Sequence, residues 1–389
     1  MIPYGKQDIS QKDVDAVVEV LKSDFLTQGP YVPEFEKQLA QYSGAQHAVA
    51  VNSATSALHI ACMALGVGPG DAVWTSPISF VASANCARYC GAAVDFVDID
   101  LATYNLCPRQ LEAKLKHAKQ HGLALPKVVI PVHLSGLPCE MSRIHELGQE
   151  YGFSIIEDAS HAVGGSYQNH KIGACEYSDI TVFSFHPVKI ITTAEGGLAT
   201  TNNNELAQKM ALFRSHGVTR DVSLMEGESH GDWYYQQVDL GYNYRMTELQ
   251  AALGCSQLTR LDEFVARRHE LAKRYLALLA HLPLVLPEFP SNSYSGLHLF
   301  IVRVDATRTH VNRKQLFDVL RDNGIGVNVH YIPIHTQPYY RKLGFSLGDF
   351  PNSEAYYDTA ISLPMFHLLT DEQQDQVVSV LTQALGASS

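Results

Sequence analysis

The sequence lacks any long apolar run, and its first residues lack the apolar core of a signal peptide. No window in the 389 residues approaches the roughly 18 consecutive apolar residues of a membrane-spanning helix. The start, Met1-Ile-Pro-Tyr-Gly-Lys6, does not resemble a secretory leader. We therefore expect a cytoplasmic protein that does not engage a membrane.

Basic residues are also fewer than acidic residues. The chain has 29 Lys and Arg against 40 Asp and Glu, which gives a formal net charge of -11 and an isoelectric point near 5.9. Nucleic-acid binders neutralise phosphates with clustered Lys and Arg, so this composition argues against a nucleic-acid partner. A small anionic ligand remains possible, because local groups can outweigh the field of the whole molecule.

Cysteines show no pattern of a disulfide framework or of a metal site. The seven residues are odd in number and contain no C-x-x-C spacing. We expect reduced, mostly buried thiols that act as small apolar side chains, and no metal. The cysteines are Cys62, Cys86, Cys90, Cys107, Cys139, Cys175 and Cys255.

Helical periodicity alternates with short β-branched runs over the first half of the chain. Helices are predicted over 33–43, 53–65 and about 80–90, and strands over 47–51, 74–76, 93–97, 127–132, 154–157 and 180–185. Strands that alternate with helices form mostly parallel sheets covered on both faces. The sequence therefore predicts an α/β fold.

The second half predicts a smaller α+β domain. A polar segment at 220–233 indicates a surface loop, and apolar residues at helical spacing over 246–279 indicate one or two long helices. Prolines at 283, 287 and 290 precede an alternating stretch at 298–304, and further helices are predicted at 314–323 and 371–385. We place the domain boundary between 250 and 290, with a large domain over 1–250 and a small one over 251–389.

Hydroxyl-bearing residues follow the first predicted strand. In Val51-Asn-Ser-Ala-Thr55-Ser56 a strand ends and a helix begins, so free backbone N–H groups and the positive end of the helix dipole point at one spot. The Thr55 and Ser56 hydroxyls add donors. This arrangement suits a phosphate group, although Ser and Thr are also ordinary helix caps.

A carboxylate ends another predicted strand, in Ile155-Ile-Glu157-Asp158-Ala-Ser-His161. Ligands of open α/β sheets bind at the carboxyl ends of the strands, and a buried carboxylate there needs a cation. A protonated pyridine nitrogen would meet that need at Asp158. The alternative is that Asp158 caps a following helix. His161 could contact a cofactor ring or fill a polar niche.

Lys189 follows the strand at 180–185, after His186-Pro187 and before Gly196-Gly197. Desolvation lowers a lysine pKa from about 10.4, which leaves neutral amine to attack a carbonyl. The glycine pair would permit close approach of the backbone. A lone lysine in a loop is usually solvated; here it follows a hydroxyl-rich helix start and a strand-end aspartate, and this order favours a nucleophile.

These motifs together resemble the DegT/DnrJ/StrS family of PLP-dependent sugar aminotransferases. The resemblance rests on five segments, Asn52-Ser-Ala-Thr-Ser-Ala-Leu58, Glu157-Asp-Ala-Ser-His-Ala162, Ser184-Phe-His-Pro-Val-Lys189, Glu195-Gly-Gly197 and Gly241-Tyr-Asn-Tyr-Arg-Met-Thr-Glu248. It extends from Gly29-Pro30 to Ser362-Leu-Pro364. It implies a type I aminotransferase fold, with a seven-stranded, mostly parallel sheet between helices, and a homodimer with active sites at the subunit interface.

The resemblance also implies roles for individual residues. Lys189 matches the lysine that carries pyridoxal 5'-phosphate (PLP) and later shuttles the proton, and Asp158 matches the partner of the pyridine nitrogen. The matching phosphate contacts are Thr55, Ser56 and Ser184, with Asn243 reaching in from the other subunit. Phe80 matches the ring that stacks on the cofactor; without the family it would be interpreted as core. The candidate substrate contacts are Tyr4, His186, Arg245, His330, Tyr331 and His335.

Departures from the commonest family pattern narrow the implied substrate. Ala54 occupies a position where the family often has Gly, and His161 occupies one where it often has Gln. In addition, His186-Pro187 precedes the lysine. This combination resembles the branch that uses L-glutamate to aminate C4 of UDP-linked 4-keto-6-deoxy-N-acetylhexosamines for pseudaminic acid. Branches that make perosamine, bacillosamine or aminoarabinose precursors share most of these residues, and a C3 aminotransferase is a further alternative.

Two other classes of protein fit the sequence less well. A nicotinamide-dependent oxidoreductase would have G-x-G-x-x-G after its first strand, whereas Gly66-Val-Gly68-Pro-Gly70 ends a predicted helix. Non-enzymatic regulators and sugar dehydratases related to the family tend to lose the lysine. The presence of Lys189 argues against a regulator and against a dehydratase.

Overall fold

The computed structural model describes residues 1–386, and its helices and strands alternate over the first half of the chain. The longer predicted helices and strands are present, within a few residues of their expected bounds. The helices are α1 (Gln11–Leu21), α2 (Tyr31–Ser43), α3 (Ala54–Ala64), α4 (Ala82–Tyr89), α5 (Pro108–Gln120), α6 (Met141–Tyr151), α7 (Asn204–Arg214), α8 (Glu248–Leu258), α9 (Leu261–Leu279), α10 (Arg313–Asp322), α11 (Pro338–Arg341), α12 (Pro351–Thr359) and α13 (Asp371–Leu385).

A seven-stranded sheet forms the centre of the molecule and confirms the α/β prediction. Its strands, in spatial order, are β1 (His47–Val51), β9 (Gly197–Thr201), β8 (Ile180–Ser184), β5 (Ser154–Asp158), β4 (Val128–Ile130), β2 (Ala72–Thr75) and β3 (Ala93–Phe96). The pairs from β8 to β3 are parallel, and only β9 runs antiparallel to its neighbours. The parallel strands therefore place their carboxyl ends along one edge of the sheet.

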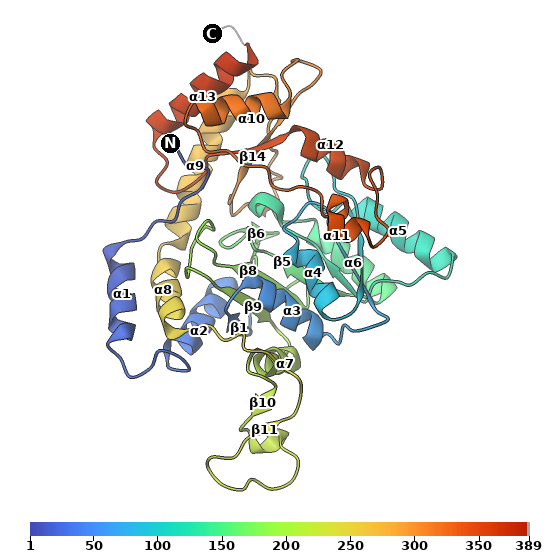
Figure 1. Cartoon of the computed structure of the whole chain (residues 1–389), viewed down its shortest axis with the longest axis vertical. Helices are drawn as coiled ribbons and strands as arrows, with labels where there is room; N and C mark the ends of the chain where they lie inside the picture. The colour runs from blue at the N-terminus through green and yellow to red at the C-terminus, as the bar shows by residue number, and fades with distance from the viewer. Residues whose placement is uncertain (387–389) are drawn as a thin grey trace.

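Helices cover both faces of this sheet, as Figure 1 shows. One apolar core joins the sheet to α2, α5, α6 and α8, with Phe35, Phe183 and Phe185 fully buried in it. The other core joins the opposite face to α3, α4 and α7. Strands buried on both faces lose the alternation of apolar and polar residues, which explains runs such as Ile180-Thr-Val-Phe-Ser184.

The C-terminal part of the chain builds a second, smaller layer on a three-stranded antiparallel sheet. Its strands are β12 (Leu284–Val285), β14 (Phe300–Val304) and β15 (Ala360–Leu363), packed in one core with α9, α10 and α13. A further small sheet joins β13 (Ser293–Tyr294), β6 (Ser166–Tyr167) and β7 (His170–Lys171). The division into 1–250 and 251–389 stays a prediction; α8 spans residue 250.

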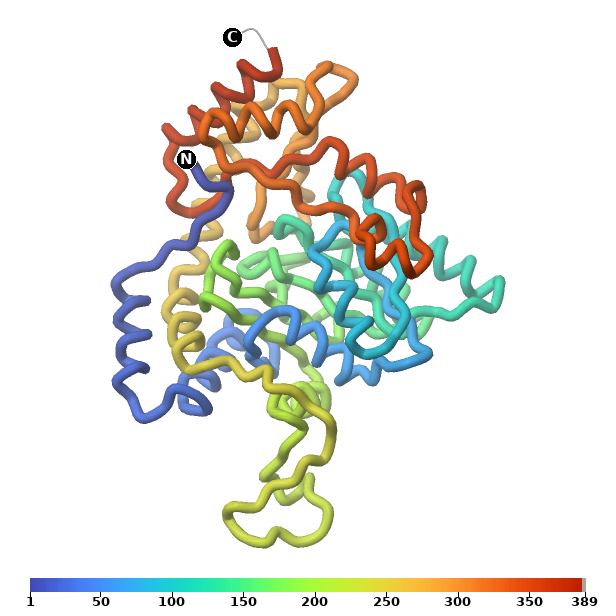
Figure 2. Tube along the Cα trace, in the orientation of Figure 1, coloured from blue at the N-terminus to red at the C-terminus, as the bar shows by residue number. Residues whose placement is uncertain are grey.

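A hairpin-like extension leaves the body of the molecule after α7. It contains β10 (Val218–Thr219) and β11 (Gln236–Gln237), and the intervening segment is the polar loop expected at 220–233. Figures 1 and 2 show it projecting beyond the helices on the side opposite α13. Within residues 1–386, no helix is both long and apolar enough to cross a bilayer.

Candidate active site

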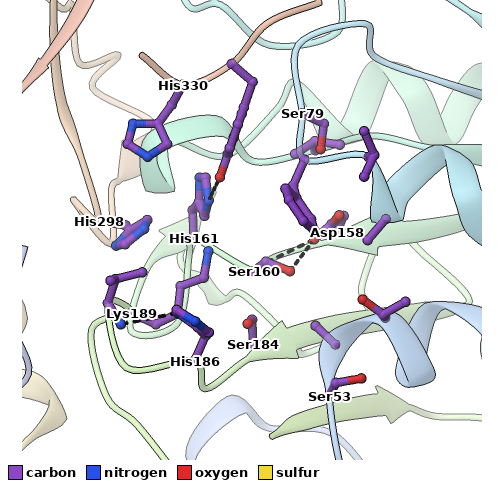
Figure 3. A pocket seen from close by; sticks show the side chains of 18 of the residues that line it. Ser53, Ser79, Asp158, Ser160, His161, Ser184, His186, Lys189, His298 and His330 are labelled. Atoms are coloured by element: carbon purple, nitrogen blue, oxygen red, sulfur yellow. Dashed lines mark hydrogen bonds between the residues drawn. The ribbon is translucent and has the colours of Figure 1, made fainter. Parts of the chain in front are cut away.

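A cavity of about 1070 Å³ lies at the carboxyl edge of the large sheet. The N-terminal arm and the segment that follows α10 line its other side. Most of the side chains singled out from the sequence line it: Tyr4, Thr55, Ser56, Phe80, Asp158, His161, Ser184, His186, Lys189, His330 and Tyr331. Segments that are far apart in the sequence therefore form one site, shown from close by in Figure 3.

The start of α3 forms one end of this cavity. Ser53 caps the helix, and its Oγ accepts a hydrogen bond from the Ser56 N–H at 3.1 Å. The Ser56 hydroxyl donates to Asn52 Oδ1 at 2.6 Å. Within the described residues, no acceptor is bonded to the N–H groups of Ala54 and Thr55. These two groups and the helix dipole form a site for an anion such as a phosphate.

Gly197 lets β9 approach this helix start closely. A Cβ at residue 197 would lie 2.4 Å from both the Ala54 nitrogen and the Ser53 carbonyl carbon, well inside van der Waals contact. A larger residue would push β9 away from the start of α3. Gly197, the second glycine of the pair, therefore serves the anion site, which agrees with the expected close backbone approach.

Asp158 ends β5 with its side chain 4% exposed. Its Oδ2 accepts a hydrogen bond from Ser83 Oγ at 2.6 Å, and its Oδ1 accepts from the Ser160 hydroxyl and backbone N–H at 2.6 and 3.1 Å. The alternative role as a helix cap is wrong, because the helix after β5 is α7, which begins at Asn204. These donors hold a carboxylate in place at the cavity wall.

Lys189 lies in the loop after β8 and faces the same cavity. Burial lowers its pKa to about 8, although the nearby Asp158 acts in the opposite direction. Among the described residues, no carboxylate lies within 4.0 Å of the Lys189 ammonium group, and the salt bridges of lysine are made by other lysines. A sizeable fraction of the amine is therefore neutral near pH 8 and able to act as a nucleophile or base.

Two predicted histidines lie close to Lys189. His161 Nδ1 accepts a hydrogen bond from the Ser135 N–H at 3.2 Å, so its Nε2 carries the proton and donates to Tyr331 Oη at 3.1 Å. Burial and the charge of Lys189 hold the pKa of His161 well below its usual range. The same two causes lower the pKa of His330 to about 3. Both imidazoles are neutral at physiological pH.

Aromatic residues form the mouth of the cavity. Phe80 is 59% exposed and lies 6.3 Å from the Tyr331 ring, so the structure excludes the interpretation of Phe80 as core. Tyr4 reaches the cavity because the N-terminal arm pairs with the smaller layer, where Ile2 bridges Ile325. The Tyr4 and His330 rings are 5.5 Å apart.

Three predicted residues lie outside the cavity of this chain. His335 is a correction: its ring is fully buried, contacts Phe350 and bonds Glu354 Oε1 at 2.9 Å, so it does not face a substrate. The Arg245 backbone pairs with Val51, and its side chain does not line the cavity. Asn243 is exposed beside the start of α3, and its reach into a second subunit stays a prediction.

The structure also adds residues, in the cavity wall and directly behind it, that the sequence analysis did not single out. Ser83 and Ser160 bond Asp158, and Ser79 bonds Ser83 at 2.7 Å. Asn328 and His298 line the wall near His330. Ser79 and Ser83 could have been found from the sequence, because they are four residues apart at the start of a predicted helix. A single histidine before an apolar run, such as His298, gives no such signal.

Chemical labelling should report the neutral amine of Lys189 directly. We expect trace acetic anhydride to acylate Lys189 of the cofactor-free protein with a pH midpoint near 8, because only the neutral amine reacts and its fraction rises as pH passes the pKa. Solvent-exposed lysines should titrate near about 10.4. Mass spectrometry of the peptides measures both in one sample. Labelling of Lys189 that keeps rising in parallel with the exposed lysines through pH 10 would contradict the lowered pKa.

The fold and the site together define a class of enzyme. An anion site at a helix start, a buried strand-end carboxylate and a partly neutral lysine converge on one cavity at the sheet edge. These groups fit the phosphate, the ring nitrogen and the aldehyde of PLP, respectively. The arrangement is that of a PLP-dependent aminotransferase.

Comparison with known proteins gives the family. The model of the DegT/DnrJ/EryC1/StrS aminotransferase family matches residues 7–382, and the chain belongs to this family. The spore coat polysaccharide biosynthesis protein SpsC of Bacillus subtilis is 39% identical over 383 residues, which cover 98% of this chain and 96% of SpsC. The family confirms the predicted enzyme class and its PLP cofactor.

Solved structures confirm the fold. PseC of Helicobacter pylori, an aminotransferase involved in the biosynthesis of pseudoaminic acid, is 32% identical, with a TM-score of 0.89 and 100% coverage of both chains. The PLP form of the sugar aminotransferase Spr1654 from Streptococcus pneumoniae is 30% identical, with a TM-score of 0.88 over 99% of this chain and 98% of that one. The protein is therefore an aminotransferase of this family with the predicted seven-stranded fold.

Proposed function

We propose that this enzyme moves an amino group from L-glutamate to C4 of a UDP-linked 4-keto-6-deoxy-N-acetylhexosamine, a step of pseudaminic acid biosynthesis. The observation that carries the proposal is the cavity that joins Lys189, Asp158 and the α3 start to the neutral His161 and to Tyr331. The similarity to PseC along the whole chain supports the substrate. Another C4 aminotransferase of the perosamine, bacillosamine or aminoarabinose type, or a C3 enzyme, is the alternative.

Each residue of the site has a proposed task in this reaction. The N–H groups at the α3 start and the Thr55, Ser56 and Ser184 hydroxyls would hold the cofactor phosphate, and Phe80 would cover its ring. The Asp158 carboxylate would face the ring nitrogen and favour its protonated form, and His161 would lie beside the ring. When bound, PLP supplies an electron sink for the pair released from a C–H bond.

Lys189 acts as the mobile base of both half-reactions. Its Nζ takes the α-proton of glutamate, which leaves as 2-oxoglutarate, and then delivers a proton to the sugar carbon that receives the nitrogen. A pKa near 8 suits an amine that must both accept and donate a proton near neutral pH. Overall, one amino acid and one keto sugar become one keto acid and one amino sugar.

A homodimer with shared active sites is part of the proposal. Among the described residues that line the cavity, Lys189 is the only Lys or Arg, so this chain alone offers little to neutralise the diphosphate of a sugar nucleotide. The extension at 218–237 exposes apolar side chains, with Trp233 74% and Tyr235 55% exposed, and it carries Arg220. A second copy would cover those rings and bring Asn243, Arg245 and the extension to the first copy's cavity. Tyr4, His186, His330 and Tyr331 remain the proposed sugar contacts from the same chain.

Loss of the Trp233 ring should weaken this dimer. We expect Trp233→Ala to raise the dimer dissociation constant by about 10- to 100-fold, in line with the loss of a buried interface tryptophan, and to lower activity at dilute enzyme. Sedimentation velocity over a dilution series measures both species. Leu347→Ala is the matched control, because Leu347 is also 74% exposed but lies on another loop. Equal dissociation constants for wild type and Trp233→Ala would rule out the extension as the interface.

A panel of substrates tests the proposed acceptor. Purified enzyme with PLP and L-glutamate is incubated with UDP-, GDP- and dTDP-linked 4-keto sugars, and 2-oxoglutarate release is followed. We expect the highest kcat/KM with the UDP-linked N-acetyl sugar. A preference for a GDP- or dTDP-linked sugar would overturn the proposed substrate and leave the aminotransferase class intact.

A further inference from the structure

His298 is a buried imidazole whose side chain makes no hydrogen bond within the described residues. The residue is 3% exposed and lines the cavity just before β14. Its Nδ1 is buried without a partner. No hydrogen bond satisfies its Nε2 within the described residues either. Because Nδ1 is closed off, Nε2 is the atom of this ring through which a ligand in the cavity can supply a hydrogen bond.

The backbone around His298 is fixed by a buried arginine. Arg268, on α9, is 2% exposed, and its NH1 donates to the carbonyl oxygens of Leu297, His298 and Met365 at 3.1, 3.2 and 3.1 Å. The Leu299 N–H donates to the Ser135 carbonyl at 3.2 Å. The backbone before and after the imidazole is therefore fixed by hydrogen bonds. A ligand-binding side chain requires such a rigid support.

The surroundings of the ring determine where its proton lies. Burial and the charges of Lys189 and Arg268 hold the pKa of His298 well below its usual range, so the ring carries one proton. A proton on Nδ1 would bury an N–H group without an acceptor, which native proteins avoid. The proton therefore belongs on Nε2, the ring nitrogen left to face the cavity, where it can be donated to a ligand.

The His298 ring lies close to the place where the reacting carbon of the substrate must be. The His298 and His161 rings are 4.5 Å apart, and Figure 3 shows both beside Lys189. In either half-reaction Lys189 must reach the carbon that loses or gains a proton. The neighbouring carbon carries oxygen in both proposed substrates: the α-carboxylate of the amino donor, and a hydroxyl or the ring oxygen of the sugar.

We propose that His298 is a substrate-binding residue whose Nε2–H donates to an oxygen on the carbon next to the reacting one. This inference rests on the proposed function, because both substrates come from it. His298 thereby fixes the orientation of the C–H bond relative to the Lys189 amine. Arg268 is the positioning residue that acts through the backbone of His298.

Binding measurements on three variants of the holoenzyme test this role. His298→Ala removes the donor, His298→Gln places an amide nitrogen near the former Nε2, and His298→Asn places one near the former Nδ1. Calorimetry measures the affinity for two probes, α-methylglutamate, which has no α-hydrogen to lose, and UDP-N-acetylglucosamine. We expect His298→Ala to weaken binding of at least one probe by about 10- to 100-fold and His298→Gln, but not His298→Asn, to recover most of it.

The pattern of losses decides between the two oxygen sources. Weaker binding of α-methylglutamate alone assigns the carboxylate, weaker binding of the UDP-sugar alone assigns the sugar oxygen, and loss of both assigns a shared contact. Unchanged affinity of His298→Ala for both probes overturns the inference, as does equal behaviour of the Gln and Asn variants, since a purely structural role would not distinguish them. If the wild-type enzyme ignores UDP-sugars, the proposed substrate is wrong, and the sugar arm is repeated with the nucleotide sugar that the substrate panel identifies.

Discussion

Lys189→Ala should abolish turnover and the visible absorbance of the lysine-bound cofactor together. The variant loses both the amine that attaches PLP and the base that moves the proton, so we expect kcat to fall by at least about 10⁴-fold, the upper end of what one acid–base residue contributes. The chain should still fold, because Lys189 makes no ion pair among the described residues. Absorbance spectroscopy and 2-oxoglutarate release measure the two losses in one preparation.

A matched lysine separates this effect from a general loss of positive charge. Lys314 lies on the exposed surface of α10 and pairs with Asp318 one turn away. Lys314→Ala should therefore keep wild-type turnover and the wild-type spectrum. Normal amino transfer by Lys189→Ala would remove Lys189 from the reaction and, with it, the proposed mechanism.

Asp158→Asn should leave PLP bound but slow both half-reactions by about 10²- to 10³-fold. The anion site and Lys189 still hold the cofactor, whereas the neutral amide no longer keeps the ring nitrogen protonated, and a preorganised charge of this kind is worth about 3 to 4 kcal/mol in the transition state. Rapid mixing with glutamate alone, and then with keto sugar alone, measures the two half-reactions separately.

Asparagine has nearly the same shape as aspartate, so Asp158→Asn tests the charge of the side chain. The amide can keep contacts with Ser83 and Ser160, whose hydroxyls both donate and accept. Asp318→Asn, which removes an exposed carboxylate from α10, should have no effect on either rate. Unchanged half-reaction rates in Asp158→Asn would take Asp158 out of the catalytic set.

Most of the fold could be predicted from the sequence because its pattern is local. Short β-branched runs and helical periodicity follow one another from residue 33, and the predicted helices and strands are present in the structure. The strand β9 escaped prediction, since Gly197-Leu-Ala-Thr-Thr201 is buried on both faces, starts with glycine and shows no alternation. Its antiparallel direction depends on pairing with β1 and β8, which only the tertiary structure provides.

The site was predictable where residues follow strand ends, and less so elsewhere. Thr55 and Lys189 follow β1 and β8, and Asp158 ends β5. These three strands run in the same direction, so the topology of the sheet brings the three residues to one edge. His335 was placed in the site by resemblance alone, and the short helical turn that carries it directs the ring toward Glu354 instead. His298 precedes an apolar strand and looks like core in the sequence; only its unpartnered ring marks it as part of the site.

Transfer of labelled nitrogen is the most direct test of the central claim. The enzyme is incubated with PLP, [15N]glutamate and a UDP-linked 4-keto-6-deoxy-N-acetylhexosamine, and the product is examined by NMR. We predict that the label appears on C4 of the sugar with wild-type enzyme and not with Lys189→Ala. Label on C3, or label that remains in glutamate while other nucleotide keto sugars are aminated, would contradict the account.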